Sequence, residues 1–139
     1  MTAQEQIDRS GGSGGRDLIN AICARFPGAE QSDPWGDGHD AWKVGGKMFA
    51  CMGAASGGVS VKTDSIETAE LLISIGVGRR APYFHRSWIN IPLDAAEDEL
   101  RHRIADSYRI IRSGLSRKMQ TSLEPYRQDP APGGMDNST

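Results

Sequence analysis

Residues 26–53 read FPGAEQSDPWGDGHDAWKVGGKMFACMG, and this segment contains the clearest structural signals of the chain. Two apolar runs, residues 41–44 and 47–52, are separated by Gly45-Gly46. Paired glycines between apolar runs are typical of a β-hairpin, because a tight primed turn needs positive φ at its central residues. With a two-residue turn, one face of the hairpin would carry Trp42, Val44, Lys47, Phe49 and Cys51, and the other Lys43, Met48, Ala50 and Met52.

The segments around this hairpin predict helices and further strands. The expected elements are a helix over residues 16–26, strands over 29–32, 59–62 and 88–93, and helices that begin after Asp64 and Asp94. Pro27-Gly28 ends the first helix, and a Glu three positions after each Asp suggests a capping box for the other two.

The predicted order of elements is α-β-β-β-β-α-β-α. Antiparallel strands with helices grouped together indicate an α+β two-layer sandwich, in which an antiparallel sheet carries its helices on one face. The chain has 139 residues, the length of a single domain. We expect a disordered Gly/Ser-rich tail over residues 1–15, a folded domain over 16–118 and a Pro/Gly-containing disordered tail over 119–139.

Composition restricts the cellular setting. No run of apolar residues approaches the roughly 18 that a membrane helix needs, and the N-terminus lacks the features of a signal peptide. We therefore expect a cytoplasmic protein that does not contact a membrane. Cys23 and Cys51 are far apart in sequence, and we expect two reduced thiols in the core.

The charge is unevenly distributed along the chain. The formal net charge is −2, which argues against a generic basic nucleic-acid coat. Residues 79–118, however, contain nine Lys/Arg and five Asp/Glu, so this segment is basic. It suggests an anionic partner, although a solvated helix face is the alternative explanation.

Signatures of catalysis and of cofactor binding are weak. The sequence pairs no Cys or Ser with an obvious His partner, and we predict that the protein is not an enzyme. Asp37-Gly38-His39-Asp40 matches neither a calcium loop nor a zinc helix, so we predict no metal and no cofactor. Gly76-Val-Gly78-Arg79-Arg80 places two guanidinium groups after a glycine loop, but we favour a helix cap followed by a solvated loop as its explanation.

Cationic and aromatic residues at several positions suggest nucleic-acid binding. Phosphates need cations, and aromatic rings can stack on bases. Lys43 and Lys47 flank the hairpin turn, as in a wing that follows a phosphate backbone. The candidate nucleic-acid-binding residues are Lys43, Lys47, Lys62, Arg86, Trp88, Arg101 and Arg112.

An ordered set of residues resembles the MmcQ/YjbR family. It comprises Pro27-Gly28-Ala29-Glu30, Trp35-Gly36, residues 42–50 (WKVGGKMFA), Val61-Lys62, Trp88 and Ser107-Tyr108, and it covers about residues 16–118. The resemblance implies a frataxin-like (CyaY-like) α/β fold in a double-wing arrangement. Members of the family are commonly labelled DNA-binding, and the resemblance supplies no catalytic residues.

Our first hypothesis is therefore a non-enzymatic module, monomeric or weakly dimeric, that binds DNA or another polyanion through a basic face. Two alternatives stay open. One is a protein-interaction or adaptor module that uses exposed Trp35, Trp42 or Met52. The other is a small-ligand domain with a pocket near His85, Trp88 and Tyr108.

Overall fold

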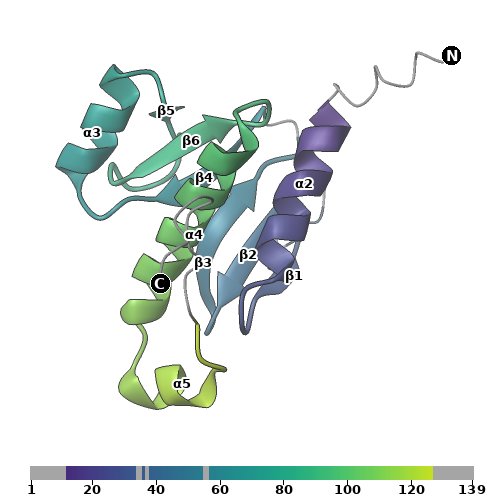
Figure 1. Cartoon of the computed structure of the whole chain (residues 1–139), viewed down its shortest axis with the longest axis vertical. Helices are drawn as coiled ribbons and strands as arrows, with labels where there is room; N and C mark the ends of the chain where they lie inside the picture. Colours follow the sequence, from purple (N-terminus) through teal and green to yellow (C-terminus); the bar gives the residue numbers. More distant parts are fainter. Residues whose placement is uncertain (1–11, 34–35, 37, 55–56, 127–139) are drawn as a thin grey trace, which may run out of the picture.

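The structure, a computed structural model, describes residues 12–33, 36, 38–54 and 57–126, and the side chains from Gly15 onward. These residues form four helices and one six-stranded sheet (Figure 1). The helices are α2 (Gly12–Ala24), α3 (Ile66–Ser74), α4 (Glu97–Ser113) and α5 (Arg117–Ser122). The strands are β1 (Glu30–Ser32), β2 (Asp40–Val44), β3 (Lys47–Met52), β4 (Gly58–Lys62), β5 (Arg79–Arg80) and β6 (Trp88–Pro92).

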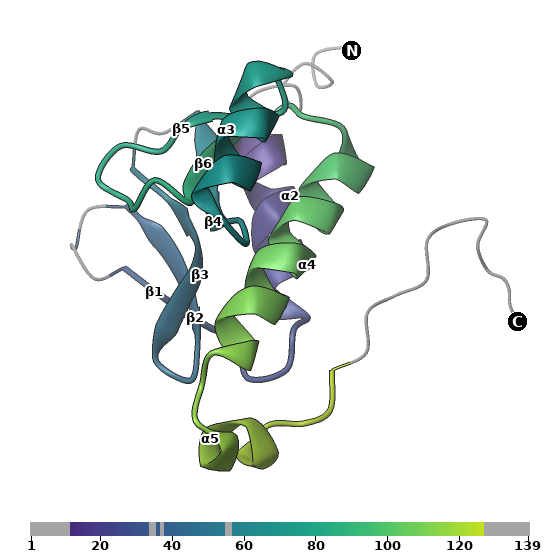
Figure 2. The same cartoon turned by 90° about the vertical axis from the view of Figure 1, so that its left-hand side faces the viewer.

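The sheet is antiparallel throughout, in the order β1-β2-β3-β4-β6-β5. Helices α2 and α4 lie against the same face of the sheet (Figure 2). Ala69 and Leu72 of α3 join the same apolar cluster as the strand residues Ile89 and Ile91. This arrangement confirms the predicted α+β sandwich with an antiparallel sheet.

The predicted hairpin is present, with one difference in register. Gly45 and Gly46 have φ of 58° and 82°, as the primed turn requires. Val44 pairs with Lys47 and Lys43 with Met48, but Trp42 pairs with Ala50. This bulge leaves Phe49 as the extra residue of β3.

The bulge changes which residues face the helices. Phe49, Ala50 and Met52 belong to the core cluster, whereas Cys51 does not. The predicted face assignment was therefore wrong for Ala50, Cys51 and Met52, because simple alternation cannot anticipate an extra residue. Cys23 and Cys51 are free and buried as expected, and burial raises the pKa of both thiols.

Helix α4 is attached to the sheet through Ser107 and Tyr108. The Ser107 hydroxyl donates to the carbonyl of Phe49 at 2.7 Å and accepts from the backbone N–H of Lys62 at 2.9 Å. The Tyr108 hydroxyl donates to the carbonyl of Pro27 at 2.6 Å, while its ring stacks on Phe26 at 4.5 Å. These two neighbouring side chains therefore connect α4 with β3, β4 and the turn after α2.

Both predicted capping boxes were wrong. Ser65, rather than Asp64, caps α3, because its hydroxyl accepts from the N–H of Thr68 at 3.0 Å. Helix α4 begins after Ala96, which makes no side-chain cap bond. A turn in which Ala95 donates to the carbonyl of Pro92 separates β6 from α4, so Asp94 lies too early to cap the helix.

The ordered region extends beyond the predicted domain at both ends. Helix α2 begins at Gly12, and Gly15 packs so closely on Leu93 that a Cβ there would lie 2.8 Å from the Leu93 carbonyl oxygen. At the other end, α5 follows α4, and Leu123 and Tyr126 pack against the core. Residues 1–11 and 127–139 lie outside the described residues, so disorder of these segments stays a prediction. No helix in the described part of the chain is long and apolar enough to cross a membrane.

Candidate functional site

The second face of the sheet has no described helix over it, and we call it the open sheet face (Figure 2). On β4 and β6 its residues alternate with the core residues Val59, Val61, Ile89 and Ile91. Register places further residues of β1, β2, β3 and β5 beside them. The open sheet face comprises Glu30, Ser32, Ala41, Lys43, Met48, Cys51, Ser60, Lys62, Arg79, Trp88 and Asn90, of which Ala41, Cys51, Ser60, Trp88 and Asn90 are buried.

A row of polar side chains crosses this face. Ser60, Asn90 and Arg79 lie directly opposite one another on β4, β6 and β5. The Asn90 amide donates to the Ser60 hydroxyl at 3.1 Å, and Nε of Arg79 donates to Oδ1 of Asn90 at 3.1 Å. Gly58 leaves room for this row, since a Cβ there would lie 2.2 Å from Asn90 Oδ1. The row fixes the Arg79 guanidinium at its Nε and leaves its terminal nitrogens without a described acceptor.

Lys62 is oriented toward the loop of residues 81–87. Its ammonium donates to the Ser87 hydroxyl at 2.6 Å, and that hydroxyl lies 2.9 Å from Nδ1 of His85. The backbone N–H of Ser87 donates to the same nitrogen at 3.1 Å, so Nδ1 is an acceptor and the Ser87 hydroxyl donates to it. Opposite Lys62, Trp88 is only 8% exposed and stacks on Phe84 at 4.6 Å.

The cations of the open sheet face lack acidic partners. Lys43, Lys62 and Arg79 form no ion pair with any described carboxylate. Glu30 lies across from Lys43 on β1 but makes no ion pair with it. This face therefore carries three cationic side chains that can attract an anion.

Three of the four arginines of α4 are paired with carboxylates of the same helix, and the fourth, Arg112, is paired with no described carboxylate. In α4, Arg101 pairs with Glu97 at 2.8 Å, and Arg103 with Glu99 and Arg109 with Asp106, each at 2.5 Å. These i,i+3 and i,i+4 pairs follow from helical spacing.

The structure does not bring all seven predicted residues to one face. Lys43, Lys62 and Trp88 share the open sheet face. The remaining four are placed elsewhere or are already paired. Lys47 lies opposite Val44 and so shares its core-facing side. Arg86 pairs with Glu70 at 2.9 Å, and Arg101 pairs within α4. Arg112 donates to the Tyr108 hydroxyl at 2.9 Å.

Among the residues that the structure describes, the members of the two alternative sets do not form a site. Trp42 and Met52, proposed as exposed anchors, are 6% and 0% exposed, and Trp35 lies outside the described residues. Tyr108 is buried on the helix side of the sheet, whereas Trp88 lies on the open sheet face and His85 in the loop before it. The pocket expected from His85, Trp88 and Tyr108 therefore does not assemble.

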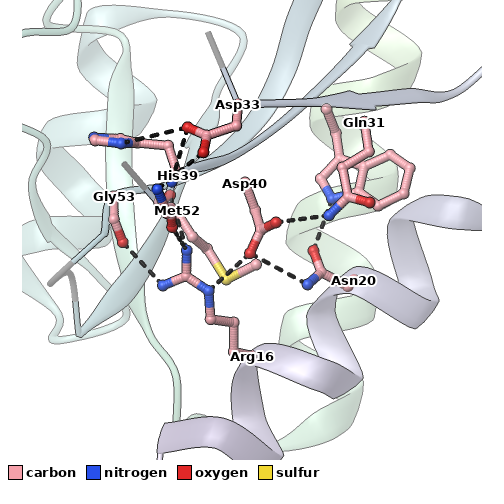
Figure 3. A network of polar contacts seen from close by, with 10 residues as sticks. Arg16, Asn20, Gln31, Asp33, His39, Asp40, Met52 and Gly53 are labelled. Atoms are coloured by element: carbon pink, nitrogen blue, oxygen red, sulfur yellow. Dashed lines mark hydrogen bonds and ion pairs between the residues drawn. The ribbon is translucent and has the colours of Figure 1, made fainter. Parts of the chain in front are cut away.

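Gly38, His39 and Asp40 belong to a polar network that fixes α2 to the sheet (Figure 3), and Asp37 lies outside the described residues. The Arg16 guanidinium donates to Asp40 at 2.7 Å, to the Gly53 carbonyl at 2.9 Å and to the Gly38 carbonyl at 2.6 Å. Asn20 and Gln31 also donate to Asp40. Among the described residues no three His, Cys, Asp or Glu side chains are grouped as metal ligands would be.

This network sets the ionisation of Asp40. Burial favours the protonated carboxyl, but hydrogen bonds from Arg16, Asn20 and Gln31 and the charge of Arg16 outweigh it, so the pKa of Asp40 lies below its usual range. The Asp40 carboxylate thus fixes the position of Arg16, and Arg16 in turn donates hydrogen bonds to the carbonyls of Gly38 and Gly53.

Sequence reasoning missed two residues beside the open sheet face. Arg79 was interpreted as part of a loop, because a two-residue strand is too short to show alternation. Tyr83 was not considered, since nothing in its neighbours signals an unusual backbone. It has φ of 73° and a fully exposed side chain.

The fold and this face define a small α+β domain with one sheet face free of described helices. The chain belongs to the YjbR family, whose model, described as YjbR, matches residues 24–110, and this confirms the resemblance noted from the sequence. The structure is also similar to the crystal structure of the Deinococcus radiodurans protein DR2400, a DUF419 domain. That likeness has a TM-score of 0.67 at 20% identity over 76% of this chain and 84% of the other. No curated protein matches the chain.

Proposed function

We propose that this YjbR-family chain is a non-enzymatic module that binds nucleic acid through the open sheet face. The observation that carries the proposal is the set of cations without acidic partners: Lys43, Lys62 and Arg79. Three of the four arginines of α4 are paired within that helix. Cations without a described carboxylate partner, on a face free of described helices, support an anionic partner.

The spacing of these cations suits an extended polyanion better than a single phosphate. Lys43 lies on β2 and Lys62 on β4, two strands apart. Neighbouring strands are about 4.8 Å apart, so the two lysine backbones are separated by roughly 10 Å. Arg79 lies on the far side of β6 from Lys62 and adds a forked donor that suits phosphate oxygens. A backbone that crosses the strands would meet the three cations in turn.

Binding to labelled single-stranded and duplex DNA at several salt concentrations tests the proposal. We expect saturable binding at low salt that weakens as salt is added. Each phosphate contact contributes about −0.9 to the log–log salt slope on duplex DNA and about −0.7 on single strands, so three contacts predict a slope of about −2 to −3. Absence of saturable binding at low salt would refute the proposal.

Matched substitutions separate the open sheet face from the rest of the surface. Lys43→Gln should weaken binding and reduce the magnitude of the salt slope by about one contact. Arg103→Gln removes the same charge from α4 and should leave both quantities almost unchanged, because Arg103 is paired with Glu99 on the other side of the sheet. Glu30→Gln should strengthen binding, since it removes the carboxylate opposite Lys43. If Lys43→Gln and Arg103→Gln changed the affinity and the salt slope equally, nucleic acid would not bind through the open sheet face.

A further inference from the structure

Tyr83 combines two unfavourable features at one position. Its φ of 73° makes it the one non-glycine residue with positive φ in the described part of the chain. For an L-residue with a bulky side chain this left-handed backbone costs roughly 1–2 kcal/mol. Its ring is also fully exposed, at 104% of the reference area. Neither feature stabilises the fold, and Gly or Asn would suit this backbone better.

The loop that carries Tyr83 is held at both ends. Ala81 is completely buried, and its carbonyl accepts from the N–H of Phe84 at 3.3 Å. At the other end, the Ser87 carbonyl accepts from the backbone N–H of Thr63 at 2.8 Å and from its hydroxyl at 2.7 Å. Tyr83 therefore projects from a loop whose two ends are fixed to the domain, so little further ordering is needed to present its ring.

The loop that carries Tyr83 contains a second aromatic residue and contacts Lys62, as a nucleic-acid-binding loop would. Phe84, the next residue, stacks on Trp88, and Trp88 lies directly opposite Lys62 in the sheet. The same loop carries His85, whose ring is hydrogen-bonded to the serine that Lys62 contacts. The loop that carries the exposed Tyr83 ring thus contacts the open sheet face beside Lys62 through Phe84 and Ser87.

We infer that Tyr83 stacks on an unpaired nucleobase, so that the module prefers single-stranded to duplex nucleic acid. This inference rests on the proposed function. Lys62 and Lys43 would hold the phosphates while a base of the same strand covers the Tyr83 ring. Stacking on an aromatic side chain needs a base whose face is free, and the bases of a duplex already stack on their neighbours.

Affinity for a labelled pyrimidine oligonucleotide and for a duplex of equal length, measured with the full chain, tests this inference. The unmodified protein should bind the single strand more tightly. Tyr83→Ala should weaken single-strand binding about 5- to 150-fold, the range found for loss of one base–aromatic stack, and should change duplex binding little. Tyr83→Phe keeps the ring and should retain single-strand affinity. Leu71→Ala, which truncates another exposed apolar side chain, on α3, should have no effect.

The possible outcomes separate this inference from the proposed function. If neither nucleic acid binds, the proposed function fails and this inference with it. If DNA binds and Lys43→Gln weakens it, but Tyr83→Ala leaves single-strand affinity unchanged or weakens both forms equally, only the stacking role of Tyr83 is overturned. Thermal unfolding of Tyr83→Ala provides the folding control, and we expect a melting temperature no lower than that of the unmodified chain, because the substitution removes no buried contact.

Discussion

The two faces of the sheet differ in how many of their cationic side chains are paired with carboxylates. On the helix side, Arg16, Arg101, Arg103 and Arg109 each pair with a carboxylate of the same layer or of the adjoining strand. On the open sheet face, Lys62 and Arg79 donate to the neutral side chains of Ser87 and Asn90, and Lys43 lies across from Glu30 without an ion pair. The described ion pairs of the helices thus lie on the helix side, although Arg112 there forms none, whereas Lys43, Lys62 and Arg79 form no ion pair with a described carboxylate and are available to a partner.

The residues that identify the family also lie partly on the helix side and partly on the open sheet face. On the helix side, Trp42 donates from its indole to Asn20 at 2.8 Å, and Ser107 and Tyr108 join α4 to the strands and to the turn after α2. Each of these has a role in the fold alone. Lys43 and Lys62 belong to the same sequence signature, yet on the open sheet face no carboxylate pairs with them. Membership of the family is thus explained mainly by architecture, and a shared activity would depend on the smaller set of half-buried lysines on the open sheet face.

The largest expected difference between the two faces concerns stability. Phe49 and Met48 are neighbours on β3, but the Phe49 ring is completely buried against Phe26 and Tyr108, whereas Met48 is half-buried on the open sheet face. Phe49→Ala should lower the free energy of unfolding by about 3–5 kcal/mol, the usual cost of removing a buried phenyl ring. Urea unfolding followed by tryptophan fluorescence measures it.

Met48→Ala is the matched substitution for that experiment. We expect it to cost about 1 kcal/mol or less, because a half-buried side chain loses less burial and leaves no closed cavity. If both substitutions destabilised the domain equally, the open sheet face would be covered in solution, and the proposed binding surface would not be free.

An intermediate effect is expected for Asp40, which faces the helices from β2. Asp40→Asn removes a carboxylate that accepts three side-chain hydrogen bonds, and we expect a loss of about 1.5–3 kcal/mol at neutral pH. Because the native pKa lies below the unfolded one, this stabilisation is fully present above about pH 4 and is lost as the pH falls through the native value. Urea unfolding of both chains over an acidic pH series should show the difference shrink. A difference that stayed constant down to the lowest pH would contradict the role of the ionised carboxylate.

The fold followed from the sequence because its signals are local. Gly45-Gly46 specifies a turn that needs positive φ, and the apolar spacing of residues 100–115 specifies a helix. The β3 bulge did not follow, since it depends on Phe49 reaching the aromatic cluster of Phe26 and Tyr108, which are distant in sequence. The caps at Asp64 and Asp94 failed for a similar reason, because the path of the chain before each helix decides which residue lies at its first turn.

The candidate site was harder to predict than the fold. A sequence shows that a residue is cationic, but whether its charge is neutralised depends on which carboxylate the fold brings near. Helical spacing could have revealed the pairs of Arg101 with Glu97 and of Arg103 with Glu99. No spacing rule links Arg86 to Glu70 or places Arg79 in a row with Asn90, because those contacts join separate elements.

The smallest expected effect concerns an arginine that was first a binding candidate. Arg101 is about half exposed, and its pair with Glu97 lies on the surface of α4. Arg101→Ala should therefore lower the free energy of unfolding by only about 0.2–0.5 kcal/mol, as exposed i,i+4 pairs do. Its DNA affinity should match that of the unmodified chain at each salt concentration, whereas Lys43→Gln should diverge from it as salt is lowered. A loss of affinity in Arg101→Ala as large as that in Lys43→Gln would show that the helix layer also contacts the nucleic acid, and the contrast between the two faces would then not describe binding.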